Sequence, residues 1–302
     1  MVLAIYSCEK TITVDIPDEG RKIVINSLYD ANGNFGVALS QSKYILETGY
    51  EFKPINNASI LLYENNQLIE TLTEESNGYY YSVTDLKQGN TYKLEAKADN
   101  WPMASCESRV PYEPKIDTTY LSVIYDVSEY YSGIRRIDFD LKFQDDGLSS
   151  NYYMLRGEYK TRQQFYNTTT GEIGYDEFLS PFSIYTNSQS NSNSSSDFDN
   201  YHGGIVFDDV LFNGKLHNLN FYTEYLYTDF TDSPDSTIRL YYYLSEISED
   251  LYKYYLSYEK YQLVNGDPFS EPVQVFSNIK NGFGIFGGRA TAVDSSSFKY
   301  GE

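Results

Sequence analysis

The stretch that decides the fold is LKQGNTYKLEAKA, which runs from Leu86 to Ala98. From Tyr92 onward, apolar side chains at even positions alternate with Lys, Glu and Lys at odd positions. Alternation with a period of two is typical of a β-strand that has one face in a core and the other in water. Leu86, Gly89 and Tyr92 also have the spacing of a tyrosine corner, in which the phenol oxygen bonds to upstream backbone. The stretch therefore predicts a β-sandwich.

Similar short runs fill the chain on both sides of this stretch. Asn65-Asn66 and Ser76-Asn77-Gly78 supply hairpin turns, because Asn and Gly tolerate positive φ angles. Residues 21–113 are thus predicted to form a small immunoglobulin/transthyretin-like β-sandwich domain. The expected strands are Lys22–Leu28, Phe35–Ser40, Ser59–Glu64, Leu68–Glu74, Tyr79–Val83, Thr91–Ala98 and Ala104–Val110.

Beyond Pro111 and Pro114 the expected strands become longer and richer in Tyr. Residues 114–302 are predicted to form a larger antiparallel β-domain with one amphipathic α-helix near 249–263. Ser248 is a good N-cap for this helix, and its aromatic stripe is expected to contact the sheet. The positions that recur at three and four residues are Leu251, Tyr254, Tyr255, Tyr258 and Tyr261 or Gln262. The expected strands are Thr119–Asp126, Arg136–Gln144, Asn151–Thr161, Gly203–Phe207, Leu216–Thr228 and Ser236–Leu244, and Thr186–Ser196 is expected to be a loop.

Composition excludes several classes of function. Among 302 residues, 23 are basic and 43 acidic, so the formal charge is 23 − 43 = −20. Such a chain repels the phosphate backbone, which excludes a general nucleic-acid binder. With 2 Cys and 2 His, the chain also has too few residues of these types for a Cys/His metal site or a disulfide framework.

The motifs that carry chemistry in other proteins are discounted here. Gly282–Gly287 matches the dinucleotide-binding spelling G-x-G-x-x-G, but only 15 residues follow it, so a buried closing strand or bulged turn is expected instead. His202 and His217 are expected to be ordinary polar residues, and Cys106 a buried free thiol. The acidic clusters, such as Asp145-Asp146 and Asp208-Asp209, could hold a hard cation if loops bring them together, although solvated carboxylates are the simpler interpretation. We assign no catalytic residue, metal ligand or cofactor, and the ligand-binding residues stay unknown.

The Tyr clusters are the strongest compositional feature, because the chain has 33 Tyr residues. Consecutive Tyr residues in a strand point to opposite faces, so each cluster places at least one phenol outward or into a second layer. Two interpretations stay open. The rings fill both faces of the β-layers, or outward rings stack on a sugar, a peptide or a protein partner. The clusters are Tyr79–Tyr81, Tyr152-Tyr153, Tyr241–Tyr243 and Tyr254-Tyr255.

The N-terminus indicates a membrane anchor. Residues Met1–Tyr6 are apolar, Ser7 precedes Cys8, and a polar stretch follows as far as Gly20. This pattern is typical of the end of a lipoprotein signal peptide, with Cys8 as the lipidated first residue of the mature chain. Residues 1–20 are then a signal remnant, lipidation site and tether, and the lipid is the expected membrane attachment.

Several of these pieces occur in an order that resembles a known family. Cys8-Glu9-Lys10, Lys22–Asn26 and Gly89–Tyr92 belong to the first half, while Phe207–Asp209, Asn265–Phe269 and Ser277–Gly288 belong to the second. Together they resemble a Bacteroidetes outer-membrane lipoprotein family catalogued as domain of unknown function 4249. The resemblance implies a lipid-anchored envelope protein at the outer membrane, commonly encoded beside a TonB-dependent transporter, and transfers only the lipidation role of Cys8.

Three functional hypotheses follow. The first is a non-enzymatic protein at the cell surface or periplasmic face that partners a TonB-dependent outer-membrane transporter in nutrient capture or uptake. The second is a carboxylate-based hydrolase of glycans or peptides, which requires two acidic side chains across a cleft. The third is a structural or adhesive envelope module.

Overall fold

The computed structural model describes residues 20–31, 33, 35–44, 47–49, 51–128, 131–166, 171–186, 204–226, 237–267 and 269–299. Strands account for 59% of the structure and helix for 7%, which confirms a mostly β protein with antiparallel sheets and one helix. The predicted loop at Thr186–Ser196 lies outside the described residues except for Thr186, and Cys8 and His202 also lie outside them.

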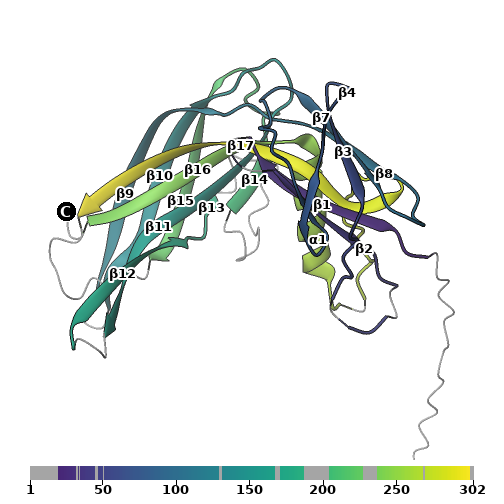
Figure 1. Ribbon diagram of the computed structural model, residues 1–302. Coiled ribbons are helices and arrows are strands. Elements are labelled where there is room, and N and C mark those ends of the chain that lie inside the picture. Colours follow the sequence, from purple (N-terminus) through teal and green to yellow (C-terminus); the bar gives the residue numbers. More distant parts are fainter. Residues whose placement is uncertain are drawn as a thin grey trace, which may run out of the picture.

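The described strands form one nine-stranded sheet and two four-stranded sheets (Figure 1). The long sheet has the order β12-β11-β16-β17-β1-β2-β6-β5, and β14 also pairs with β11. Its strands are β1 (Ile23–Asp30), β2 (Gly36–Gln41), β5 (Thr73–Ser76), β6 (Tyr79–Tyr81), β11 (Tyr152–Tyr166), β12 (Ile173–Pro181), β14 (Gly204–Asp208), β16 (Thr237–Ile247) and β17 (Gly282–Lys299).

Each small sheet packs on a different part of the long sheet and encloses a core. The first lobe is the core between β1, β2 and β6 and the sheet β4-β3-β7-β8. The second lobe is the core between β11, β14 and β16 and the sheet β13-β15-β10-β9. The bounds are β3 (Ser59–Glu64), β4 (Gln67–Thr71), β7 (Thr91–Lys97), β8 (Ala104–Arg109), β9 (Lys115–Ser128), β10 (Tyr131–Gln144), β13 (Tyr185–Thr186) and β15 (Leu216–Leu226).

The last strand, β17, joins the two lobes. Its first part, Gly282–Arg289, pairs in parallel with β1, and its second part, Arg289–Lys299, pairs antiparallel with β16. The expected closing strand at Gly282–Gly287 is therefore confirmed. The division of the chain after residue 113 stays a prediction, and the structure adds that a strand from the end of the chain completes the sheet of the first lobe.

The glycines of β17 explain the G-x-G-x-x-G spelling. Gly284 has a φ of +106°, and a Cβ there would lie 2.1 Å from the carbonyl oxygen of Ile25. A Cβ on Gly288 would lie 1.8 Å from the ring of Tyr29. The spelling thus reflects close packing of β17 on β1 and its side chains, since other residues do not fit there.

Helix α1 (Glu249–Val264) begins after the predicted N-cap Ser248, whose hydroxyl accepts a hydrogen bond from the amide of Leu251 at 3.4 Å. Leu251, Tyr252 and Tyr255 are its buried residues, and they pack on Met154 and Ile285 of the long sheet. The expected aromatic stripe is correct for Tyr255 but wrong for Tyr261, which is 37% exposed. The rings of Tyr254, Tyr258 and Tyr261 stack on one another along the helix.

The strand predictions differ from the structure in several places, since neither β13 nor the part of β17 beyond Gly287 was predicted. The expected strand Leu68–Glu74 is two strands, β4 and β5, which belong to different sheets because the chain crosses between layers at Leu72. Leu72 is buried, and its amide bonds to the carbonyl of Ile60 at 2.9 Å. Strand β12 was not predicted, since its polar and apolar residues do not alternate.

The tyrosine corner is confirmed. The Tyr92 ring is buried, and its phenol oxygen accepts from the amide of Lys87 at 3.0 Å and donates to Glu64 at 2.6 Å. Asn90 donates to the same carboxylate at 2.8 Å. These hydrogen bonds lower the pKa of Glu64, because they stabilise its charged form.

Candidate ligand-binding cleft

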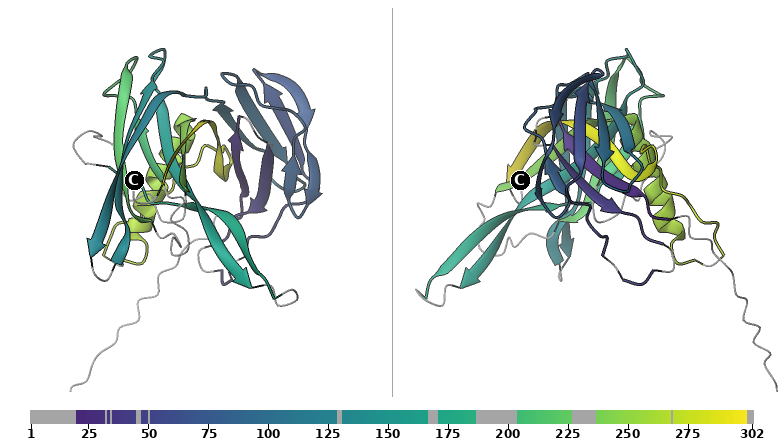
Figure 2. Two further views of the ribbon diagram at one scale, coloured as in Figure 1. Left: turned by 90° about the vertical axis from the view of Figure 1, so that its left-hand side faces the viewer. Right: turned by 45° about the vertical axis from the view of Figure 1, so that its right-hand side comes forward.

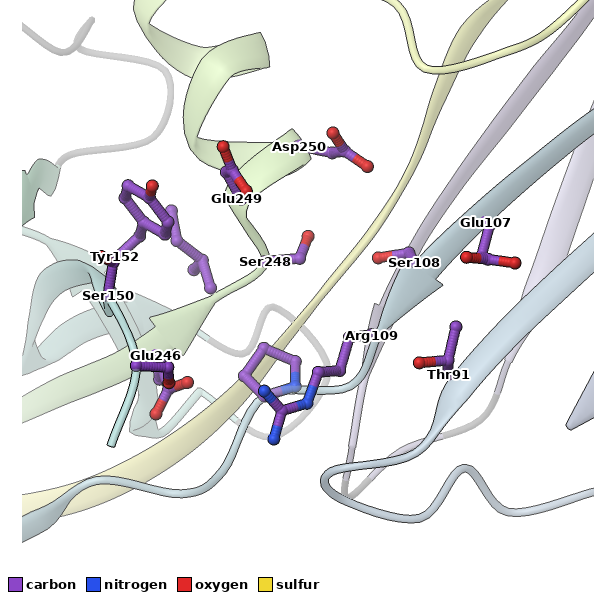
Figure 3. Close-up of a pocket in the computed structure, with 13 residues that line it drawn as sticks. Thr91, Glu107, Ser108, Arg109, Ser150, Tyr152, Glu246, Ser248, Glu249 and Asp250 are labelled. Carbon is purple, nitrogen blue, oxygen red and sulfur yellow. The ribbon is translucent and has the colours of Figure 1, made fainter. Parts of the chain in front are cut away.

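A cleft of about 620 Å³ lies where the two lobes meet. One wall is the end of β8, Glu107–Arg109, with Thr91 of β7 beside it. The other wall is Glu246–Asp250, which spans the end of β16 and the start of α1, with Ser149, Ser150 and Tyr152 beside it. Figure 3 shows these two groups of side chains on opposite sides of the hollow.

Hydrogen bonds with residues of the first lobe hold the β8 wall of the cleft in place. Ser108 is buried, and its hydroxyl accepts a hydrogen bond from the phenol of Tyr29 at 3.0 Å. Burial raises the pKa of Tyr29, so the phenol stays a donor. The guanidinium of Arg109 donates through Nε to the carbonyl of Gly89 at 3.2 Å and lies 5.6 Å from the Tyr112 ring centroid. Arg109 is therefore held as the cation of the cleft.

Asn278 fixes the opposite wall. Its side-chain nitrogen donates to Asp250 at 2.9 Å and to the carbonyl of Phe286 at 2.8 Å, while its oxygen accepts from the amide of Phe286 at 3.0 Å. The Ser248 hydroxyl also accepts from the amide of Gly288 at 3.3 Å. The start of α1 is thereby tied to β17, so the segment Ser277–Gly288 positions the cleft.

Glu246 is the carboxyl group with the most perturbed environment in this cleft. Burial raises its pKa to about 7, and the charge of Asp146 adds to this effect, while hydrogen bonding and Arg109 oppose it. Glu246 therefore exchanges its proton near neutral pH, as a general acid or a pH-sensitive ligand contact would.

The charges of the cleft favour a neutral or cationic ligand. Glu107, Glu249 and Asp250 outnumber Arg109, and Glu246 adds negative charge as pH rises. Lys253 offsets part of this by pairing with Glu249 at 2.7 Å. The serine hydroxyls and the phenol of Tyr152 add hydrogen-bonding groups, so a polyol or an amine matches the walls better than an anion.

Asp145 and Asp209, which belong to two of the predicted acidic clusters, accept hydrogen bonds that stabilise loops. Asp145 accepts hydrogen bonds from the phenol of Tyr153 at 2.6 Å and from the amide of Gly214 at 2.6 Å. Asp209 accepts from the amide of Asn151 at 2.9 Å. Among the described residues, no group of three or more His, Cys, Asp and Glu is placed to hold a metal ion.

The other predicted residues have structural surroundings. His217 stacks on Phe212 with ring centroids 3.8 Å apart, and burial lowers its pKa. Cys106 is a buried free thiol, as predicted. Tyr80 is 1% exposed while Tyr79 and Tyr81 are 52% and 43% exposed, which confirms the alternation of faces in that cluster.

Sequence reasoning did not single out the cleft as a site. Its walls come from segments about 140 positions apart, and neither carries a motif of known chemistry. The available signals were indirect, namely the N-cap at Ser248 and the block Ser277–Gly288.

These features define a class of two-lobed, mostly β proteins in which the last strand joins the lobes and a polar cleft lies at the junction. The chain belongs to the family described as domain of unknown function (DUF4249), whose model matches residues 9–295. No curated protein matches the chain. None of the helical segments that the structure describes has the length and apolar character needed to cross a membrane.

Proposed function

We propose that this protein is a lipid-anchored outer-membrane protein that assists a TonB-dependent transporter by binding its nutrient in the cleft between the lobes. Membership of the family supports this proposal. The resemblance to that family implies a lipoprotein of the Bacteroidetes cell envelope. The apolar stretch before Cys8 supports lipidation at that residue. The anchor would place the protein at the cell surface or the periplasmic face.

The observation that carries the binding role is the cleft itself. Its volume of about 620 Å³ lies within the range of small-molecule sites. Both lobes contribute walls, and hydrogen bonds hold each wall, from Tyr29 to Ser108 on one side and from Asn278 to Asp250 on the other. A preorganised polar site of this kind supports selective capture of a small hydrophilic nutrient.

Co-purification tests this function. Outer membranes extracted with mild detergent should yield the wild-type protein together with a large β-barrel transporter. Cys8→Ser removes the proposed lipidation site and should release the protein from the membrane fraction, whereas Cys106→Ser should leave it there because that thiol is buried. A wild-type protein that always isolates alone would contradict the transporter partnership.

A carboxylate-based hydrolase is the second candidate, favoured by Glu246. A carboxyl group with a pKa of about 7 suits a general acid, and other carboxylates line the same cleft. Glu246→Gln should abolish hydrolysis of a glycan or peptide library if the protein is such a hydrolase. An absence of hydrolysis by the wild type would exclude the hydrolase.

The third candidate is the adhesive or structural module, which requires no ligand in the cleft.

A further inference from the structure

A second hollow, of about 370 Å³, lies where the described chain begins. It is lined by Gly20 and Arg21 before β1, by Gln41–Lys43 after β2, and by Lys53. Backbone hydrogen bonds tie these segments together: Ser42 donates to the carbonyl of Lys22 at 2.9 Å, and Gln41 donates to that of Lys53 at 3.0 Å. The backbone that carries the basic side chains around the hollow is therefore held by hydrogen bonds.

Each of three cations here lies over an aromatic ring, and the first is the Arg21 guanidinium, 5.8 Å from the Tyr44 centroid. The Lys43 ammonium is 4.8 Å from the Phe52 centroid, and the Lys22 ammonium is 5.0 Å from the Phe283 centroid. Phe52 is 61% exposed and Phe283 is 40% exposed. Exposed rings beside ammonium groups are amphipathic in the manner of side chains at a membrane interface. We call this region the N-terminal face, made of Arg21, Lys22, Lys43, Lys53, Phe52 and Phe283.

The charge of the N-terminal face is opposite to that of the molecule. Its four basic residues exceed the two neighbouring carboxylates, Glu47 and Glu51, by 4 − 2 = +2, while the whole chain carries −20. Arg21 pairs with Glu47 at 2.9 Å, and the half-buried Lys43 donates to the carbonyl of Gly49 at 2.9 Å, whereas Lys53 is exposed. An anionic surface would attract this face and repel the rest.

The position of the N-terminal face in the sequence also indicates that it faces the membrane. Gly20 lies twelve positions after Cys8, and a chain of that length spans at most about 43 Å when fully extended. A lipid on Cys8 would therefore keep the N-terminal face close to the membrane.

We propose that the N-terminal face rests on anionic lipid headgroups, with its basic side chains at the headgroups and Phe52 inserted at the interface. This inference rests on the lipid-anchored part of the proposed function. It gives the anchored protein an orientation, in which the first lobe faces the membrane and the acidic remainder points away from it.

The test uses the full chain carrying Cys8→Ser, so that lipidation does not contribute. Its partitioning is measured by flotation with vesicles of phosphatidylcholine alone and with vesicles of phosphatidylcholine and phosphatidylglycerol in equal parts. We expect binding to the mixed vesicles only, with a loss of binding at high salt. Adding Lys43→Gln and Lys53→Gln should weaken it by at least about tenfold, since each basic side chain near an anionic surface contributes roughly a fivefold factor.

The matched control carries Lys115→Gln and Lys215→Gln, two exposed lysines of the second lobe. This control changes the net charge equally and should bind as the parent does. Equal binding to both vesicle types, no binding to mixed vesicles, or an equal loss in the control would overturn the inference. Because lipidation is absent throughout, such a result would leave the co-purification test of the proposed function unaffected.

Discussion

At the scale of single residues, a few polar side chains each hold two segments together. Tyr92 is the clearest case, because its phenol joins Lys87 before β7 to Glu64 at the end of β3. Tyr92→Phe removes both hydrogen bonds and leaves the amide of Lys87 without this acceptor. We expect the free energy of unfolding to fall by about 1–3 kcal/mol, measured by urea denaturation. Tyr81→Phe alters an exposed ring and should change it by much less. Equal effects of the two changes would contradict this role of the phenol.

Glu246 makes a prediction about pH. Its pKa rises from 4.5 in the unfolded chain to about 7 in the folded protein, so the folded state binds the proton more tightly. The stability that this group contributes is complete below about pH 4.5 and is lost as pH rises through about 7. Between about pH 5 and pH 8 the wild type should lose on the order of 2 kcal/mol more than Glu246→Gln does. Glu249→Gln, an exposed change in the same cleft, should keep the wild-type pH profile. A wild-type profile in Glu246→Gln would mean that Glu246 titrates normally.

Residue roles were predictable from sequence where they depend on local spacing. The corner at Tyr92 and the cap at Ser248 each involve partners within five positions, so the printed sequence contains them. The raised pKa of Glu246 depends chiefly on burial and to a smaller extent on the charge of Asp146, and both come about only in the tertiary structure.

At the scale of elements, β17 determines the arrangement of the lobes. Its glycines allow the strand to lie against Tyr29 of β1 and against the start of α1. Figure 2 shows β17, in yellow, beside β1, in purple, and beside α1. Gly288→Ala places a Cβ within 1.8 Å of the Tyr29 ring, so the ring or the strand must move. We expect a loss of about 3 kcal/mol or more in the free energy of unfolding, with weaker ligand binding in the cleft. Gly33→Ala is the matched control, because its Cβ meets only ordinary contacts at 3.5 Å. A neutral Gly288→Ala would contradict the close packing of β17.

Most strands were predictable from alternation, as in β3, which matches its expected range, Ser59–Glu64. The pairing of β17 with β1 was not, because the two strands are about 260 residues apart and alternation does not identify a partner. The cleft could not be predicted for the same reason. Its walls meet only after this pairing forms.

At the scale of the whole molecule, the shared sheet predicts cooperative unfolding. Trp101 is the one Trp of the chain, and it packs against the core of the first lobe. Trp fluorescence therefore reports on the first lobe, whereas far-ultraviolet circular dichroism reports on all strands. We expect coincident urea transitions by the two methods, because β17 belongs to the sheets of both lobes. Two separate midpoints would show that the lobes unfold independently.

The most direct test of the account is the mass of the N-terminal peptide of the mature protein isolated from its native cells. We predict a chain that begins at Cys8 and carries a diacylglycerol group on the thiol with an acylated amino group. A mature chain that retains residues 1–7 and an unmodified Cys8 thiol would contradict the anchored binding protein that we propose.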